Sequence, residues 1–228
     1  MNIYAIGDLH LTTDESKTMD KFGWTGHDRR IFEDWNEKVT GDDVVLIAGD
    51  ISWAMKFEQA LPDLERIHAQ KGLKILVKGN HDYWWDSITR LNSLYEDMFF
   101  LQNNIKELDS VVIAGSRLWL APNDGNYSDE DEKIYRREQI RLENSLSLAK
   151  KTGKEIILLT HFPPANENLD DNPVLHIVEN YSVSHMIYGH LHGKTAHKTA
   201  LKGFRNGTYF HLVSCDYTDF KLLKIASF

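Results

Sequence analysis

The chain has 228 residues, of which 42% are hydrophobic and 26% are charged, and its formal net charge at pH 7 is −8. This length suits one well-cored domain, and the composition is that of an ordinary soluble protein. No apolar run approaches the roughly 20 residues that span a bilayer, which excludes a transmembrane helix. The negative charge, with no basic run longer than two residues, argues against an extended nucleic-acid surface.

Two features point to a cytoplasmic location. The first apolar run begins at Asn2, which leaves no room for a signal peptide before it. The single cysteine, Cys215, cannot close an intramolecular disulfide, which fits a reducing compartment. We therefore expect a cytoplasmic protein that makes no use of a membrane.

The first part of the chain alternates strands with helices. Short apolar runs bounded by Gly or polar residues indicate buried strands, and apolar residues at three- and four-residue spacing indicate helices. The strands are expected at 3–6, 44–48 and 75–77, and the helices at 28–40, 58–70 and 86–95.

The second part of the chain is richer in strands. Segments 104–108 and 111–114 predict a hairpin. Ser128 can cap a helix with an acidic first turn that ends at Gly153, and Pro173 opens a short helix. Further strands are expected at 156–159, 186–188, 195–201, 208–213 and 222–225. This order predicts a layered α/β fold with one domain over residues 1–228, carrying an insertion at about 117–151.

Five polar motifs follow these apolar runs in a fixed order. They are Asp8-Leu9-His10, Gly49-Asp50, Gly79-Asn80-His81-Asp82, His161 and Gly189-His190-Leu191-His192. In a layered α/β fold, ligands gather outside the carboxyl ends of the strands. Seven oxygen and nitrogen donors between Asp8 and His192 could therefore converge on one point.

The set of motifs closely resembles the calcineurin-like metallophosphoesterase superfamily. The superfamily pattern Asp-x-His, Gly-Asp, Gly-Asn-His-(Asp/Glu), His and Gly-His-x-His is met in full between residues 8 and 192. The resemblance implies a β-sandwich with helices on both outer faces, which makes four layers. It also implies a phosphohydrolase that uses two divalent metal ions to activate water against a small phosphate mono- or diester.

The Gly49-Asp50 motif departs from that of the protein phosphatases in this superfamily. Protein phosphatases of this superfamily carry Gly-Asp-x-x-Asp-Arg-Gly, whereas Gly49-Asp50 is followed here by Ile51-Ser52-Trp53. The second Asp and the Arg are absent, which argues against protein-phosphatase activity. The remaining pattern is that of small bacterial phosphoesterases and cyclic-nucleotide phosphodiesterases, so a small phosphorylated substrate is the expected partner.

The resemblance also implies a division of the donors between two metals. Two divalent cations roughly 3.5–4 Å apart need a bridging carboxylate, and Asp50 is the residue implied for that role. The first metal would be held by Asp8, His10 and His192, and the second by Asn80, His161 and His190. This mixture of imidazole, carboxylate and amide donors favours Mn, Fe, Zn or Co over Ca or Mg.

Five further residues are candidates for roles in catalysis, substrate contact or the support of the site. His81, beside Asn80, is expected to act as general acid or to orient the phosphate. Asp82 either orients His81, or caps the following helix or supports the local loop. The substrate contacts expected are His27, in a Gly-punctuated loop, and Arg117 and Tyr127, in a segment that forms an active-site wall. The alternative for that segment is a solvated surface helix.

Two other functions remain open from the sequence. A nuclease of the same superfamily would need a basic groove beside the metals, for which the sequence offers little. A non-catalytic metal-binding scaffold would have no need of His81 as a proton donor.

Overall fold

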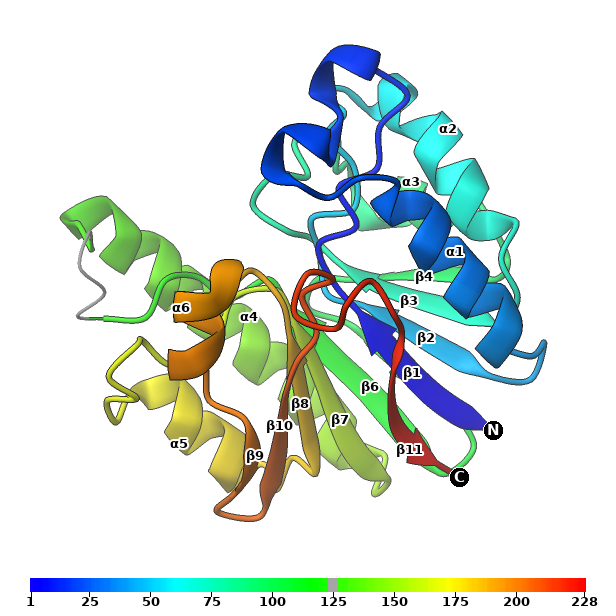
Figure 1. Cartoon of the computed structure of the whole chain (residues 1–228). Helices are drawn as coiled ribbons and strands as arrows, with labels where there is room; N and C mark the ends of the chain where they lie inside the picture. The colour runs from blue at the N-terminus through cyan, green and yellow to red at the C-terminus, as the bar shows by residue number, and fades with distance from the viewer. Residues whose placement is uncertain (123–126) are drawn as a thin grey trace.

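The computed structural model describes residues 1–122 and 127–228 and shows two β-sheets packed face to face (Figure 1). The first sheet has parallel strands β1–β4, with β11 antiparallel to β1 at its edge. In spatial order its strands are β11 (Leu223–Ser227), β1 (Asn2–Ile6), β2 (Val44–Ile47), β3 (Leu73–Val77) and β4 (Met98–Leu101).

The second sheet has four parallel strands flanked by an antiparallel strand at each edge. In spatial order its strands are β5 (Ile105–Glu107), β6 (Val111–Ser116), β7 (Glu155–Thr160), β8 (His185–Tyr188), β10 (Thr208–Leu212) and β9 (Gly203–Arg205). The predicted hairpin is therefore confirmed as β5 and β6.

Helices cover the outer face of each sheet, so the molecule has four layers (Figure 1). The first sheet carries α1 (His27–Lys38), α2 (Phe57–His68) and the single turn α3 (Ile88–Leu91). The second carries α4 (Asp129–Lys151) and α5 (Pro173–Asn180). The shorter helices are η1 (Glu15–Lys17), η2 (Met19–Phe22) and α6 (Gly193–Thr199). The predicted α/β sandwich with helices on both faces is confirmed.

Alternation along the strands produces three separate cores. In β1, Ile3 and Ala5 point into the core between the sheets, while Tyr4 and Ile6 pack against the outer helices with Trp35 of α1. Successive strand side chains point to opposite faces, so a strand buried on both sides is apolar throughout. This is why the runs before the polar motifs are continuous rather than alternating.

One predicted element is wrong. Residues 195–201 were expected to form a strand, but Gly193–Thr199 is helix α6. Strands β8 and β10 are parallel neighbours, and a parallel pair requires a crossover connection rather than a hairpin. The helix α6 and the edge strand β9 together form that connection.

The predicted helix at 86–95 is also shorter than expected, because only Ile88–Leu91 is helical. Within the described parts of the chain, no helix is both long and apolar enough to cross a membrane.

Candidate metal centre

The predicted donors lie on loops at the carboxyl ends of five parallel strands, and several of these loops are strained. Asp8, His10, Asp50 and His190 have φ angles of 58°, 44°, 50° and 70°, in the left-handed region. Such a conformation costs a non-glycine residue on the order of 1–3 kcal/mol and persists only where the surroundings enforce it. Strain concentrated on four of the seven predicted donors marks this edge of the sheets as a functional site.

The glycines of the motifs provide the space in which donors from different loops meet. A Cβ on Gly49 would lie 2.7 Å from Nδ1 of His161, and one on Gly189 would lie 2.5 Å from Oδ2 of Asp8. A Cβ on Gly79 would overlap the carboxylate of Asp50. Each glycine therefore makes room for a donor that another motif delivers.

The first group of donors is formed by Asp8, His10 and His192, whose ligand atoms lie within 4.8 Å of one another. Nε2 of His192 is 3.5 Å from Oδ1 of Asp8. Burial raises the pKa of Asp8, but the hydrogen bond and charge of His192 outweigh it and hold the pKa well below its usual range. Burial lowers the pKa of His10 to about 3, so its imidazole is neutral at pH 7.

The second group contains Asp8, Asp50 and His161, with Asn80 and His190 beside them. Nδ1 of His161 donates to the carbonyl oxygen of Ala48 at 2.8 Å, which leaves Nε2 as a lone-pair acceptor. That Nε2 is only 2.7 Å from Oδ1 of Asn80, which is also an acceptor. Burial lowers the pKa of His161, so no proton relieves this contact at neutral pH. Two acceptors at this distance repel each other unless a cation lies between them, and the pair therefore fits a metal ion.

Asp50 lies between the two groups. Its Oδ2 is 3.8 Å from Nε2 of His10 and 3.6 Å from Nε2 of His161. Its Oδ1 accepts the backbone N–H of His81 at 2.8 Å. Burial, followed by the charge of Asp8, raises the pKa of Asp50 to about 7. Two buried carboxylates side by side are costly without positive charge, which two divalent cations would supply.

Asp82 has the local loop role that was one of its expected alternatives, and it does not cap the following helix. It is fully buried, and the N-cap of α3 is Ser87 instead. The Asp82 carboxylate accepts hydrogen bonds of 2.7–3.2 Å from the backbone N–H groups of Ile51, Ser52 and Gly79 and from the indole of Trp84. It therefore ties the Asp50 loop to the Asn80 loop.

Asp216 is a site residue that the sequence analysis missed. Its Oδ1 lies 2.9 Å from Nδ1 of His192, and its Oδ2 accepts the N–H of Gly193 at 2.9 Å. Burial lowers the pKa of His192, but hydrogen bonds to Asp216 and Asp8 outweigh it and raise the pKa to about 10. A carboxylate behind a histidine fixes the ring and directs its other nitrogen. The signal was available, because Asp216 follows the parallel strand β10 as the other motifs follow theirs.

A cavity of about 470 Å³ opens above both groups. Its lining residues are His10, Met19, Phe22, Trp24, Asp50, Trp53, His81, His190, His192, Gly193 and Asp216. The His81 ring centroid lies 4.8 Å from that of Trp53, which itself stacks on His10 at 4.7 Å. The cavity thus combines donors at its base with an aromatic wall.

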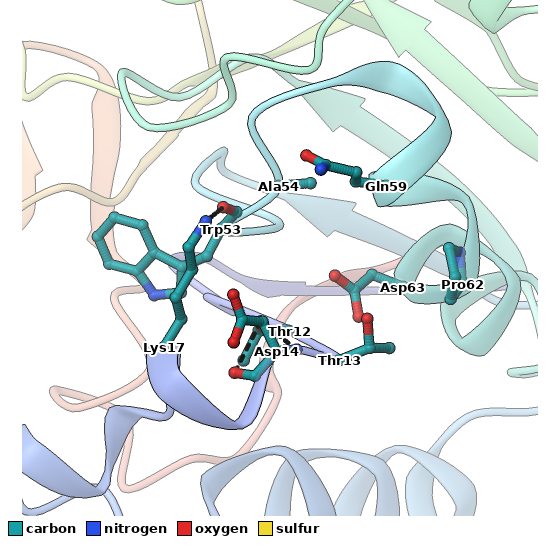
Figure 2. Close-up of a pocket in the computed structure, with 9 residues that line it drawn as sticks. All are labelled: Thr12, Thr13, Asp14, Lys17, Trp53, Ala54, Gln59, Pro62 and Asp63. Atoms are coloured by element: carbon teal, nitrogen blue, oxygen red, sulfur yellow. Dashed lines mark hydrogen bonds between the residues drawn. The ribbon is translucent and has the colours of Figure 1, made fainter.

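Trp53 also lines a smaller cavity of about 280 Å³ beside the first (Figure 2). Nζ of Lys17 donates to the backbone oxygen of Trp53 at 3.2 Å, and Asp63 lies on the opposite side of this space (Figure 2). The Trp53 indole itself is held by its N–H, which donates to Sδ of Met19 at 3.2 Å, and by its stacking on His10, so its other contacts place it as a wall beside His81.

The predicted substrate contacts lie outside the lining of the larger cavity. Nε2 of the buried His27 is 2.9 Å from the carbonyl oxygen of Leu9. The Tyr127 hydroxyl donates to Glu132 at 2.7 Å. The Arg117 carbonyl accepts the N–H of His161 at 3.2 Å, and its guanidinium lines a neighbouring cavity. The structure thus brings together the seven predicted donors and His81. Arg117 and His27 contact the loops that carry donors, whereas Tyr127 bonds to α4.

Comparison with known proteins agrees with this geometry. The model of the calcineurin-like phosphoesterase family matches residues 1–194. The Gene 66 protein of Mycobacterium phage D29 is 35% identical over 99 residues, which is 41% of this chain. The matched part spans about half, 48%, of the phage protein.

Two solved structures share the fold. A protein of unknown function, AQ665 from Aquifex aeolicus, superimposes with a TM-score of 0.53 at 17% identity, covering 98% of this chain and 95% of that one. GAP50, the anchor in the inner membrane complex of Plasmodium, gives 0.52 at 13% identity, covering 95% and 72%. With the family model matched over most of its length, the chain belongs to the calcineurin-like phosphoesterases, a family of metal-dependent phosphoesterases.

Proposed function

We propose that this protein is a dimetal phosphohydrolase that cleaves a small phosphate mono- or diester. The observation that carries the proposal is the position of Asp50, whose carboxylate lies within 4 Å of a histidine from each donor group, at the base of the cavity. A carboxylate shared by two donor sets is the arrangement that a pair of divalent cations requires.

We assign the donors to the two ions as the sequence pattern implies. Asp8, His10 and His192 would hold one ion, and Asn80, His161 and His190 the other, with Asp50 shared. When bound, the two ions would neutralise phosphate oxygens and acidify a water molecule. The nitrogen-rich set favours Mn, Fe, Zn or Co.

His81 is the proposed proton donor to the leaving group. Its ring lines the cavity beside Trp53, and its backbone N–H is bound to the Asp50 carboxylate. The position of the ring is therefore linked to that of the shared carboxylate. A positioned imidazole that protonates the departing oxygen typically contributes about 10²–10⁴ in rate.

The cavity wall favours a substrate with an organic, partly apolar group. Phe22, Trp24 and Trp53 offer ring faces on which such a group can pack while its phosphate reaches the donors. Phe22 is 68% exposed, so the wall extends to the rim of the cavity.

The test is to load the protein with Mn and screen it against matched phosphomonoesters and phosphodiesters, with Asp50→Asn as the control. We expect two metal ions per chain, hydrolysis of at least one substrate class, and loss of both metals and activity in Asp50→Asn. Metal analysis that finds at most one ion per chain under Mn or Zn excess would contradict the dimetal model.

A further inference from the structure

A second cavity borders the metal centre at the same edge of the sheets. Its volume is about 410 Å³, and it is lined by Lys78, Trp85, Asp86, Ser87, Leu101, Gln102, Arg117, Arg137, Glu138 and Arg141. Lys78 follows β3 and lies two residues before Asn80, so their Cα atoms are at most about 7 Å apart. The backbone oxygen of Arg117 binds the N–H groups of His161 and Phe162 at 3.2 and 3.0 Å. The cavity is therefore joined to the loops that carry Asn80 and His161.

Positive charge dominates the lining of this cavity. Four of its residues are basic, and two, Asp86 and Glu138, are acidic. Asp86 is already bonded to Arg90 at 2.5 Å. The buried Glu138 is shared by Arg141, at 2.6 Å, and Arg117, at 3.8 Å, so one carboxylate faces two guanidinium groups. The cavity thus holds more positive charge than its own carboxylates balance.

The same lining offers neutral hydrogen-bond donors. Nε1 of Trp85 is buried and, within the part of the chain that the structure describes, has no hydrogen-bond partner. Ser87 and Gln102 add a hydroxyl and an amide. Because Nε1 of Trp85 is itself inaccessible, Ser87 and Gln102 are the neutral polar residues that a ligand in the cavity would meet.

We propose that this cavity is a subsite for a second phosphate-class anion, carried by the same substrate whose ester is cleaved at the metal centre. The proposal rests on the function proposed above and narrows the substrate to phosphoesters that bear a second phosphate. Guanidinium forks bind phosphate oxygens in pairs, and a partly buried setting strengthens each contact. Arg137 and Arg141 lie four residues apart on α4, so both project from one helix face toward the ligand.

The chain offers a matched pair of variants for the test. Arg137 lines the cavity and is exposed, so its replacement leaves the fold intact. Its neighbour Arg136 is 74% exposed and pairs with Glu132 at 2.5 Å, away from the cavity lining. Arg136→Gln therefore removes the same charge from the same turn of α4 without removing a ligand contact.

Binding is measured by calorimetry with pyrophosphate as the probe. The protein is Asp50→Asn treated with a chelating resin, so that the metal centre does not contribute. We expect one pyrophosphate per chain, and Arg137→Gln in that background should weaken binding about fivefold, as for one partly exposed charge. Arg137→Glu should weaken it further, and Arg136→Gln should match the background. No binding, or equal losses from the two arginines, would overturn the proposal.

Kinetics on the Mn-loaded protein identify the source of the anion. The ratio of KM for adenosine 3′,5′-bisphosphate to KM for adenosine 5′-monophosphate should rise about fivefold in Arg137→Gln and stay at the wild-type value in Arg136→Gln. If sulfate instead alters nitrophenyl phosphate turnover in wild type and Arg136→Gln but not in Arg137→Gln, the cavity binds a free anion. That result would overturn the proposal that the second phosphate belongs to the substrate.

The outcomes separate the two proposals. An inactive protein that still binds pyrophosphate through Arg137 would refute the phosphohydrolase and retain the anion site. An active enzyme without that binding would refute the anion site alone.

Discussion

Replacing Gly49 with alanine is expected to be far more damaging than replacing a glycine with the same backbone conformation elsewhere. Gly49 has a φ of 81°, and its added Cβ would lie 2.7 Å from Nδ1 of His161 and 2.8 Å from the Gly79 backbone. Gly153, at the end of α4, has a φ of 70° and no atom within 4 Å of its added Cβ. The two positions share the cost of a left-handed alanine and differ in crowding.

The expected stability losses follow from the cost of the left-handed backbone and the cost of overpacking. Left-handed backbone costs an alanine about 1–2 kcal/mol, so Gly153→Ala should lose about that much stability. Overpacking adds about 1–3 kcal/mol, which brings the loss for Gly49→Ala to about 2–5 kcal/mol. For a protein of this size each kcal/mol lowers Tm by about 2–4 °C, so Gly49→Ala should melt about 4–20 °C below wild type.

Thermal and urea unfolding of both variants, metal-free and Mn-loaded, measure the difference. Gly49→Ala should also bind metal more weakly, because the added Cβ displaces the His161 ring, whereas Gly153→Ala should bind metal as wild type does. Equal stability losses in the two variants, or normal metal binding by Gly49→Ala, would refute the argument that Gly49 is there to make space for His161.

Three further predictions concern the metal centre. His81→Ala should lower kcat strongly for alkyl phosphates and much less for nitrophenyl phosphate, whose leaving group needs no proton. Its metal content should be unchanged. Equal losses of kcat for both substrates would make His81 a positioning residue. Asp216→Ala should raise the Mn concentration for half-saturation about ten- to a hundredfold at pH 9, where protons on His192 compete less with the metal. The control is Asp219→Ala, at an exposed position. If the two variants give the same Mn titration curve, Asp216 is not part of the site. In the metal-free protein, the stability of wild type relative to Asp50→Asn should fall as pH rises from 4 to 7. The pKa of Asp50 is raised from 3.8 to about 7, so the stability that its bound proton contributes is complete below pH 3.8 and is lost as pH rises through 7. A difference between the two urea midpoints that stays constant with pH would contradict this.

The sequence by itself predicted the main buried strands and the candidate donors of the site. Both are local properties: an apolar run such as Val44–Ile47 reports a strand buried on two faces, and the polar residue that follows it must lie where that strand ends. The seven donors and His81 could be named without knowing how the two sheets face each other. The sequence did not show which residues surround each donor.

Only the tertiary structure decided those neighbours, because they depend on contacts between residues distant in the sequence. The strand expected at 195–201 became α6 once β8 and β10 paired in parallel. Asp216 orients His192 because β10 places it behind that ring. Asp82 joins the Asp50 loop to the Asn80 loop through its hydrogen bonds. The basic cavity combines Lys78, which follows β3, with Arg117, which follows β6, and with the arginines of α4, and no local pattern brings these together. Such long-range contacts are set by the packing of the whole core, since every strand and helix must be placed before two loops can meet.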